Sequence, residues 1–457
     1  MRHLKYFTAL GLVLAAAPSF ASTFDQFTPL AASVTGGSLP EDKPFLLSSP
    51  DFMQETLNAN NLGAQNGGVK LGDNWDMNTL NETGPNAGRF LFTPYETGSA
   101  GVRRLDVVTG KAETIVANGT QGFINGDASR WTPFGTYLTA EESWGVGSTK
   151  GRLFEVSNPL APAGSTGFVE RNIIPRVSHE GLSFDANNSL YFIDENNSGS
   201  IYKYVSDTPT AGSTFFTAGK TYVLKAAAAG ADATGAATWE QITNSDGTAL
   251  DAADNVIIGG QTFVDGRKAA DRVGGSAYNR PEDLEIKTVG GEQKLYFAAT
   301  ASSTGGAGAV FAIGLNDNTN ATITLFANRD TLKKGTGAAV GLEFLNPDNL
   351  AIDGLGNIYI VEDQPGGFAD IWFAYDIDFD GVAESLGRWA SLSTLGAEPT
   401  GLYFDPFRSN VAYVNVQHTD SDVDRTIRIT AVPEPVTVSL LLGGLGLMGG
   451  MAKRRRA

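Results

Sequence analysis

Short runs of alternating hydrophobic and polar residues, separated by turns, fill most of the chain and predict β-strands. One phrase returns four times: a polar or acidic opening, an alternating apolar run, a turn at Asp, Asn or Gly, and a second run around a tyrosine. The copies are SHEGLSFDANNSLYFIDE (178–195), RPEDLEIKTVGGEQKLYFAA (280–299), NPDNLAIDGLGNIYIVED (346–363) and EPTGLYFDPFRSNVAYVNVQ (398–417). A strand–turn–strand unit repeated along a chain predicts a β-propeller or a solenoid.

Two weaker strand units precede the four clear ones, at residues 88–96 and 131–142. Six units predict six blades, with five or seven left open. The alanine- and glycine-rich stretch 225–237 is expected to be an inserted loop, with a short helix as the alternative. No long segment with helical period stands out, so we predict an all-β propeller that occupies residues 23–431 as one domain.

The sequence pattern at both ends of the chain predicts targeting segments. Residues 1–22 combine a basic start, an apolar run and small residues near Ala21, which is the pattern of a secretory signal peptide. At the other end, Val436 to Ala452 is an uncharged apolar stretch of span length, followed by a basic tail of Lys453 and three arginines. An ordinary C-terminal membrane anchor is one interpretation of this segment.

The last 26 residues also resemble a PEP-CTERM sorting signal of Gram-negative bacteria that produce exopolysaccharide. The resemblance rests on Pro433-Glu434-Pro435 directly before the apolar stretch and the basic tail, which places the signal at 432–457. It implies recognition by an exosortase, transient membrane anchoring and removal of the tail. We therefore expect a protein of the periplasm, cell surface or extracellular matrix, with exopolysaccharide as a candidate partner.

Composition agrees with export and limits the chemistry. The chain has no cysteine, so it can form no disulfide and use no thiolate. Removing the two ends takes away six of the 33 basic residues and one of the 50 acidic ones, which leaves a net charge of −22. This charge argues against a nucleic-acid partner. The negative charge is consistent with the binding of divalent cations, or with solubility alone. We expect the protein to be a monomer.

Several motifs follow one another over residues 88–425. They are AGVRRLDVVTG (100–110), TPFGTYLTAEES (132–143), His179-Glu180-Gly181, Arg280-Pro281-Glu282-Asp283-Leu284, Asn346-Pro347-Asp348-Asn349-Leu350, Glu362-Asp363, and Glu398-Pro399-Thr400-Gly401 leading to Val416-Gln417-His418. Together and in order, they resemble the PhoX-type alkaline phosphatases, which are secreted, calcium-dependent propeller enzymes. The resemblance implies hydrolysis of a phosphate ester at a metal centre in the propeller channel.

The chain departs from the family phrase at two positions, and Phe134 in place of a tryptophan is the milder change. Where PhoX-type enzymes carry a cysteine that ligates iron, this chain has Ala140. Calcium needs only oxygen ligands, which the chain retains, whereas a methyl group cannot ligate iron. We therefore expect calcium as the cofactor and a weakened or absent iron site.

The candidate metal ligands are acids at the strand ends of the repeats, because these ends converge on the channel of a propeller. Repeat position and the resemblance together select Glu141, Glu142, Glu180, Glu282, Asp283, Asp348, Asn349, Glu362 and Asp363, with His179 as a weaker candidate. Asp194-Glu195 matches Glu362-Asp363 by repeat position, and one acid of each pair could complete a site. Successive side chains alternate along a strand, so we expect one member of each neighbouring pair to face the channel. Solvated acids and turn caps are the alternative interpretation.

Two residues are candidates for catalysis. Arg280 could bind a phosphate through a bidentate pair or balance the neighbouring acids in a structural salt bridge. His418 follows the last predicted core strand and is a candidate proton donor.

A separate acidic loop, DIDFDGVAE, begins at Asp376 and is similar to calcium loops of several families. An EF-hand loop has a glutamate at its twelfth position, whereas this loop has Gly387 there. Two interpretations of the loop therefore stay open, a peripheral calcium site and an Asp-rich turn without a metal.

Three functions remain open. The first is phosphomonoester hydrolysis by a metal-bound water, since the chain has no G-x-S-x-G elbow, no cysteine and few histidines. The second is a non-catalytic, calcium-stabilised protein of the cell surface or exopolysaccharide matrix. The third is calcium-dependent hydrolysis of another ester or a lactone, by analogy of fold.

Overall fold

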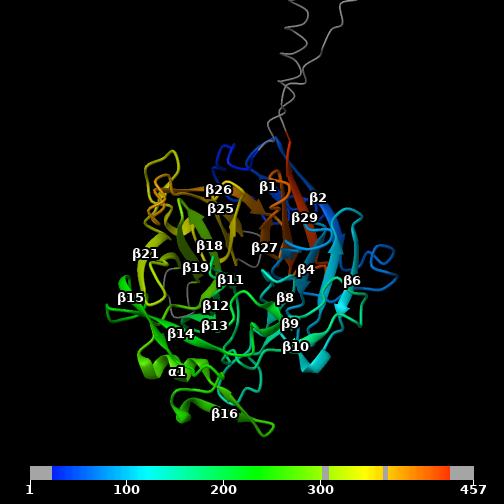
Figure 1. Cartoon of the computed structure of the whole chain (residues 1–457). Helices are drawn as coiled ribbons and strands as arrows, with labels where there is room; N and C mark the ends of the chain where they lie inside the picture. The colour runs from blue at the N-terminus through cyan, green and yellow to red at the C-terminus, as the bar shows by residue number, and fades with distance from the viewer. Residues whose placement is uncertain (1–22, 301–307, 364–368, 433–457) are drawn as a thin grey trace, which may run out of the picture.

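The computed structural model describes residues 23–300, 308–363 and 369–432, and these residues form an all-β protein with a propeller arrangement. The sheets follow one another around a common centre, and the colour runs once around the molecule from the N-terminal to the C-terminal strands (Figure 1). The predicted signal peptide and the sorting segment from Pro433 onward lie outside the described residues. None of the described helices is long and apolar enough to span a membrane.

Antiparallel meanders make up the sheets. The first two contain β3 (Thr79–Leu80), β4 (Phe90–Pro94), β5 (Val102–Asp106) and β6 (Lys111–Val116), then β7 (Arg130–Trp131), β8 (Tyr137–Ala140), β9 (Leu153–Val156) and β10 (Phe168–Glu170). A nine-stranded sheet follows, in the order β11 (Leu182–Phe184), β12 (Leu190–Ile193), β13 (Ile201–Ser206), β14 (Gly219–Ala226), β15 (Gly235–Gln241), β21 (Asn320–Asn328), β20 (Ala309–Gly314), β19 (Glu292–Ala299) and β18 (Pro281–Val289).

The last two sheets each recruit strands from the N-terminal region. One contains β23 (Pro347–Ile352), β24 (Ile358–Glu362), β25 (Asp370–Tyr375), β26 (Ser385–Leu392), β1 (Phe45–Leu47) and β22 (Leu332–Lys333). The other contains β27 (Glu398–Phe404), β28 (Val411–Gln417), β29 (Arg425–Ala431) and β2 (Phe52–Ala59). Because β2 pairs antiparallel with β29, from Phe52 opposite Ala431 to Ala59 opposite Arg425, the two ends of the described chain close one sheet.

An excursion between β15 and β18 contains the remaining strands and the one α-helix of the described residues. The hairpin of β16 (Asn255–Ile258) and β17 (Gln261–Val264) leads into α1 (Gly266–Val273), which begins at the N-cap Asp265 and ends at Gly274 in the left-handed conformation. The expected loop at 225–237 is a turn over its central residues, 227–234, which connect β14 to β15, while the residues at both ends of the stretch belong to these two strands.

The aspartate and the tyrosine of the repeated phrase are joined by a hydrogen bond within the repeat. In three copies the aspartate accepts backbone N–H bonds from the turn that follows it, and the tyrosine of the next strand donates its hydroxyl to the same carboxylate. The pairs are Asp185 with Tyr191, Asp353 with Tyr359, and Asp405 with Tyr413. Each turn is thereby fixed from within its own repeat, which sets the register of the two inner strands.

Apolar layers fill the spaces between neighbouring sheets. The layer between the last two sheets, for example, packs Trp389, Tyr359 and Phe404 with ring centroids 4.4–6.2 Å apart. The innermost strands also contact one another in succession, β11 with β18, β18 with β23, and β23 with β27. The starts of these inner strands therefore gather around one axis, and this is where the acidic residues lie.

Candidate metal and active site

A row of acidic residues lies at the starts of the innermost strands. Each repeat contributes one, between three residues before the strand and the second residue of the strand: Asp76, Asp127, Glu180, Glu282, Asp348 and Glu398. A left-handed turn residue precedes most of them by two positions, and these residues are Asn74, Asn125, Arg280, Asn346 and Gly396. Asn and Gly favour this conformation, whereas arginine does not. This turn therefore leads into five of the six acids, and Glu180, which follows Ser178, is the exception.

A second row follows the neighbouring strand of each repeat. It consists of Glu96 after β4, Glu142 after β8, Glu195 after β12, Asp363 after β24 and His418 after β28. The backbone N–H groups of four of them donate to the turn residues of the first row: Glu96 to Asn74, Glu142 to Asn125, Glu195 to Ser178, and Asp363 to Asn346. Because paired strands are antiparallel, the end of one lies beside the start of the other, so both rows share one end of the propeller.

Two basic side chains accompany these acids in the part of the chain that the structure describes. Arg280 Nε lies 2.6 Å from Glu195 Oε1 and 3.0 Å from Glu282 Oε1. His418 lies between Glu96 and Glu398, as described below. The acidic residues far outnumber these two cations. We refer to the two rows, with Arg280, as the central cluster.

Burial and mutual repulsion strongly perturb the acids of the central cluster. Removal from water, reinforced by neighbouring carboxylates, raises the pKa of Glu180, Glu282 and Asp348 well above the usual range. The same causes raise the pKa of Asp76 to about 7 and that of Glu96 to about 8. Without a cation, the central cluster therefore takes up protons near neutral pH, and cation binding would release them.

The geometry fits a cation that prefers oxygen ligands. Glu180, Glu195 and Glu282 each offer a carboxylate oxygen, and the three oxygens lie within 4.8 Å of one another. Within the described residues, Asp127 Oδ1 and Asp363 Oδ1 are buried and lack a hydrogen-bond donor, whereas Glu282 Oε1, which also lacks one, has the Arg280 guanidinium 3.0 Å away. Buried carboxylate oxygens without donors are costly unless a cation neutralises them, and six to eight oxygens are what calcium takes. The donor set of the central cluster therefore suits calcium.

The structure separates the members of each predicted pair. Glu142, Glu180, Glu282, Asp348 and Asp363 belong to the central cluster, whereas their neighbours hold strands together. Asp283 accepts N–H bonds from Leu284 and Leu350, Asn349 accepts from Thr400 and Gly401, and Glu362 accepts from Leu345, Asp370 and Trp372. Alternation along the strand explains the division, as the sequence predicted for one member of each pair.

Glu141 points away from the central cluster into a buried ion pair. Its Oε1 lies 2.5 Å from Arg152 Nη2, and its Oε2 accepts from Arg152 Nε at 2.9 Å. His179 also lies apart, with its ring 5.3 Å from that of Phe192, and burial lowers the pKa of this histidine to about 3. These two positions are occupied by side chains that pack the sheets.

We expect Arg152→Met to lower the free energy of unfolding by about 3–5 kcal/mol, because the fully buried Glu141 carboxylate would lose its partner. Urea unfolding measures the change. Arg428→Met is the matched control: its partner Glu55 is 57% exposed, and we expect a loss below about 1 kcal/mol. Equal losses in the two variants would contradict the structural role of Glu141.

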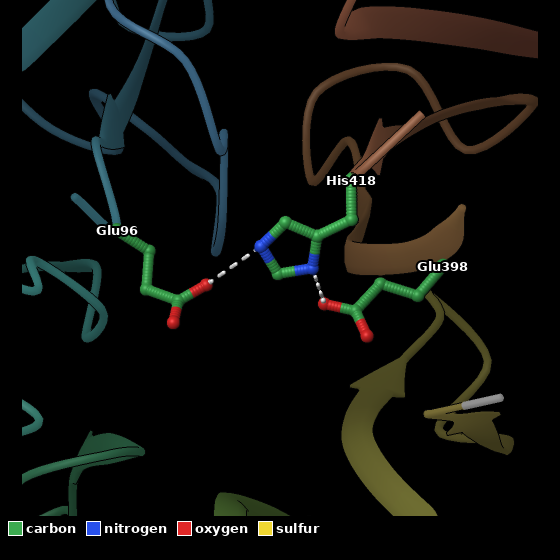
Figure 2. Close-up of side chains that lie close together, drawn as sticks. All are labelled: Glu96, Glu398 and His418. Carbon is green, nitrogen blue, oxygen red and sulfur yellow. Dashed lines mark ion pairs between the residues drawn. The ribbon is translucent and has the colours of Figure 1, made fainter. Parts of the chain in front are cut away.

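His418 forms the rim of the central cluster with two glutamates. Figure 2 shows its ring between the carboxylates, with Nε2 3.6 Å from Glu96 Oε2 and Nδ1 3.3 Å from Glu398 Oε1. The hydrogen bond with Glu398 raises the pKa of His418 to about 9, and the same contact helps to lower the pKa of Glu398 to about 2. In the metal-free protein His418 is therefore a cation at neutral pH, and can donate a proton.

The raised pKa of His418 predicts a pH-dependent stability. The ion pair contributes fully below the unfolded pKa of 6.5 and is lost as the pH rises through about 9. Because the side chain is 36% exposed, we expect a contribution of about 1–2 kcal/mol. Unfolding measured in chelator should show this loss in the parent and not in His418→Gln. The same alkaline loss in both proteins would contradict the assignment.

The comparison with known protein families agrees with this geometry. The model of the family described as "Alkaline phosphatase PhoX" matches residues 78–420, which include most of both rows. The chain belongs to the PhoX alkaline phosphatase family. This membership confirms the resemblance drawn from the sequence motifs, and it supports a phosphatase-like hydrolase. No curated protein matches the chain.

Solved structures share the arrangement of this PhoX-family chain only distantly. They include U3-55K (10% identity, 78% of this chain and 95% of that chain, TM-score 0.38). A mutant α-L-arabinofuranosidase of Fusarium graminearum in complex with an iminosugar inhibitor has a TM-score of 0.40, at 10% identity over 78% of this chain and 93% of that one. A polysaccharide lyase of family PL25, an ulvan lyase, has a TM-score of 0.35 at 10% identity, over 78% and 94% of the two chains.

Ala140 of this PhoX-family chain ends β8 and is fully buried. It packs in an apolar layer with Ala128, Leu138 and Leu153. Its methyl group is thus part of the contact between two sheets.

Four members of the central cluster were not selected from the sequence: Asp76, Glu96, Asp127 and Glu398. A signal for three repeats was present, since Asn-x-Asp occurs at 74–76, 125–127 and 346–348. In each case the asparagine forms the left-handed turn and the aspartate enters the central cluster.

Proposed function

We propose that this chain is an exported, calcium-dependent phosphatase that hydrolyses phosphomonoesters in the central cluster. The observation that carries the proposal is the excess of buried carboxylates, two of them with oxygens that have neither a donor nor an ion-pair partner in the described chain, beside a partly exposed arginine in a PhoX-family chain. Calcium held there would bind phosphate oxygens, offset their charge and supply a metal-bound water as the nucleophile. Glu142, Glu180, Glu195, Glu282, Asp127, Asp348 and Asp363 are the candidate ligands.

The conformation of Arg280 supports a role on the substrate. It has a φ of 55°, at the turn position that Asn74, Asn125 and Asn346 occupy in other repeats. A left-handed arginine is strained, and such strain is found where the side chain itself is needed. Both ion pairs use Nε, and 38% of the side chain is exposed. The guanidinium can therefore balance Glu195 and Glu282 while its outer nitrogens bind a phosphate.

His418 would complete the site as a general acid. It is cationic at neutral pH in the metal-free protein, is 36% exposed and also has a left-handed φ of 55°. Its contact with Glu398 orients the ring, so that Nε2 points along the rim toward Glu96. From this position it could donate a proton to the leaving alcohol.

The substitution at Ala140 favours one alternative, a non-catalytic surface or matrix protein that retains calcium for stability. Our proposal assigns calcium and no iron to the central cluster, since Ala140 offers no ligand. Export through the 1–22 signal, processing of the 432–457 segment by an exosortase, and a monomeric state belong to the same proposal. For the fold, we propose that β15 and β21 join two blades, which gives six.

Hydrolysis assays on the mature chain test the function. We expect calcium-dependent release of nitrophenol from p-nitrophenyl phosphate that a chelator abolishes. Turnover of p-nitrophenyl acetate with none of the phosphate would favour the ester or lactone hydrolase instead. Bound calcium without turnover of either compound would contradict the enzyme proposal and leave the metal-stabilised scaffold.

A further inference from the structure

We propose that the loop between β25 and β26 binds a divalent cation of calcium size, separate from the central cluster. The loop contains Asp376, Asp378, Asp380, Gly381 and Glu384. Carboxylate oxygens of Asp376, Asp378 and Glu384 lie within 4.8 Å of one another. This spacing lets one ion contact all three.

The buried residue of this group provides an independent observation. Asp376 is only 8% exposed, and its Oδ1 has no hydrogen-bond partner in the described chain. Its other oxygen, Oδ2, lies 3.5 Å from the Tyr296 hydroxyl. A buried carboxylate oxygen without a donor is costly, and a cation shared with Asp378 and Glu384 would remove this cost.

The local charge matches one divalent ion. Two lysines from the neighbouring sheet face the loop: Lys294 Nζ donates to Phe379 O at 2.6 Å, and Lys287 Nζ lies 4.2 Å from the centre of the Phe379 ring. The four carboxylates of the loop, at positions 376, 378, 380 and 384, exceed these two lysines by two charges. One divalent cation would neutralise the remainder.

The loop is held in place from the next sheet, so little ordering would be needed on binding. Thr324 of β21 donates to Gly381 O at 3.0 Å, in addition to the Lys294 contact. Gly381 has a φ of 91°, and Phe379 a φ of 58°, which fold the loop back on itself. An ion here would hold the loop in the conformation that contacts the neighbouring sheet.

The loop lies at the opposite end of the propeller from the central cluster. β25 begins at Asp370, whose N–H donates to Glu362 Oε2 next to Asp363 of the central cluster, and it runs away from there to Tyr375. Binding at the two places can therefore be measured separately. The failure of one assignment would leave the other standing.

Calcium counting by equilibrium dialysis tests the proposal on the mature chain. We expect the double variant Asp378→Asn with Glu384→Gln to bind one calcium fewer than the parent. Terbium should bind at the loop with luminescence sensitised by Tyr296, and we expect this signal to survive in the double variant Glu180→Gln with Glu282→Gln. Asp317→Asn, which alters an exposed turn capped by its own carboxylate, is the control with unchanged binding.

An unchanged calcium count in the loop double variant would overturn the proposal. If that variant does not fold, the exposed single change Asp378→Asn replaces it, and we expect at least tenfold weaker terbium binding. Unaltered terbium affinity in Asp378→Asn would equally overturn the site.

Discussion

Replacement of Glu180 and Glu282 together by glutamine is expected to lower kcat/KM for a phosphomonoester by at least about 100-fold. Loss of one residue that only hydrogen-bonds to a metal ligand already costs 10–100-fold in metal affinity or activity. Glu180 and Glu282 would contact the ion directly. Glutamine keeps the size of the side chain and removes its charge. Initial rates with p-nitrophenyl phosphate at saturating calcium measure the loss.

The stability of the same double variant separates lost metal binding from misfolding. In chelator, we expect it to melt at or above the temperature of the parent, because two crowded carboxyl groups are gone. In calcium, we expect it to gain less stability than the parent does. Glu292→Gln, an exposed change on the β18–β19 hairpin, is the matched control. Parental activity in the double variant would contradict the proposed ligand roles.

Arg280→Asn is expected to lower kcat/KM about 10–100-fold, the usual worth of a hydrogen bond to a charged group. Asparagine is the residue that other repeats use at this left-handed turn, so the backbone is expected to tolerate it. The loss should be accompanied by weaker inhibition by inorganic phosphate. Steady-state kinetics with phosphate as a competitive inhibitor measure both effects.

Arg280→Lys provides the comparison for this prediction. It keeps the charge but not the planar, bidentate guanidinium, and we expect it to recover only part of the lost activity. If Arg280→Asn instead changed the melting temperature and left kcat/KM and phosphate inhibition unchanged, Arg280 would serve only as a salt bridge between Glu195 and Glu282.

The repeated strand pattern was sufficient to predict an all-β propeller, because each copy carries its own turn. The Asp185–Tyr191 bond and its equivalents are local, so their residues lie close in the sequence. Closure of the last sheet by β2 was not predicted, since residues 52–59 pair with residues 425–431 from the far end of the chain. Such long-range pairing has no local pattern.

The repeated pattern also predicted part of the candidate site, because it fixes where each acid stands relative to its strand. Glu180, Glu282 and Asp348 follow from repeat position, and the structure brings them together. Asp76 and Asp127 precede very short inner strands of two residues, so their repeats lack the alternating run that marks the others. The direction of Glu141 depends on Arg152, eleven residues away across a hairpin, and strand alternation alone could not choose between Glu141 and Glu142.

The metal content of the purified mature chain tests the central claim most directly. Elemental analysis of the parent and of the double variant Glu180→Gln with Glu282→Gln, after dialysis without chelator, would measure it. We predict bound calcium in the parent, no stoichiometric iron, and less calcium in the variant. No bound divalent metal in the parent, or the same calcium in both proteins, would contradict a metal centre among the buried carboxylates.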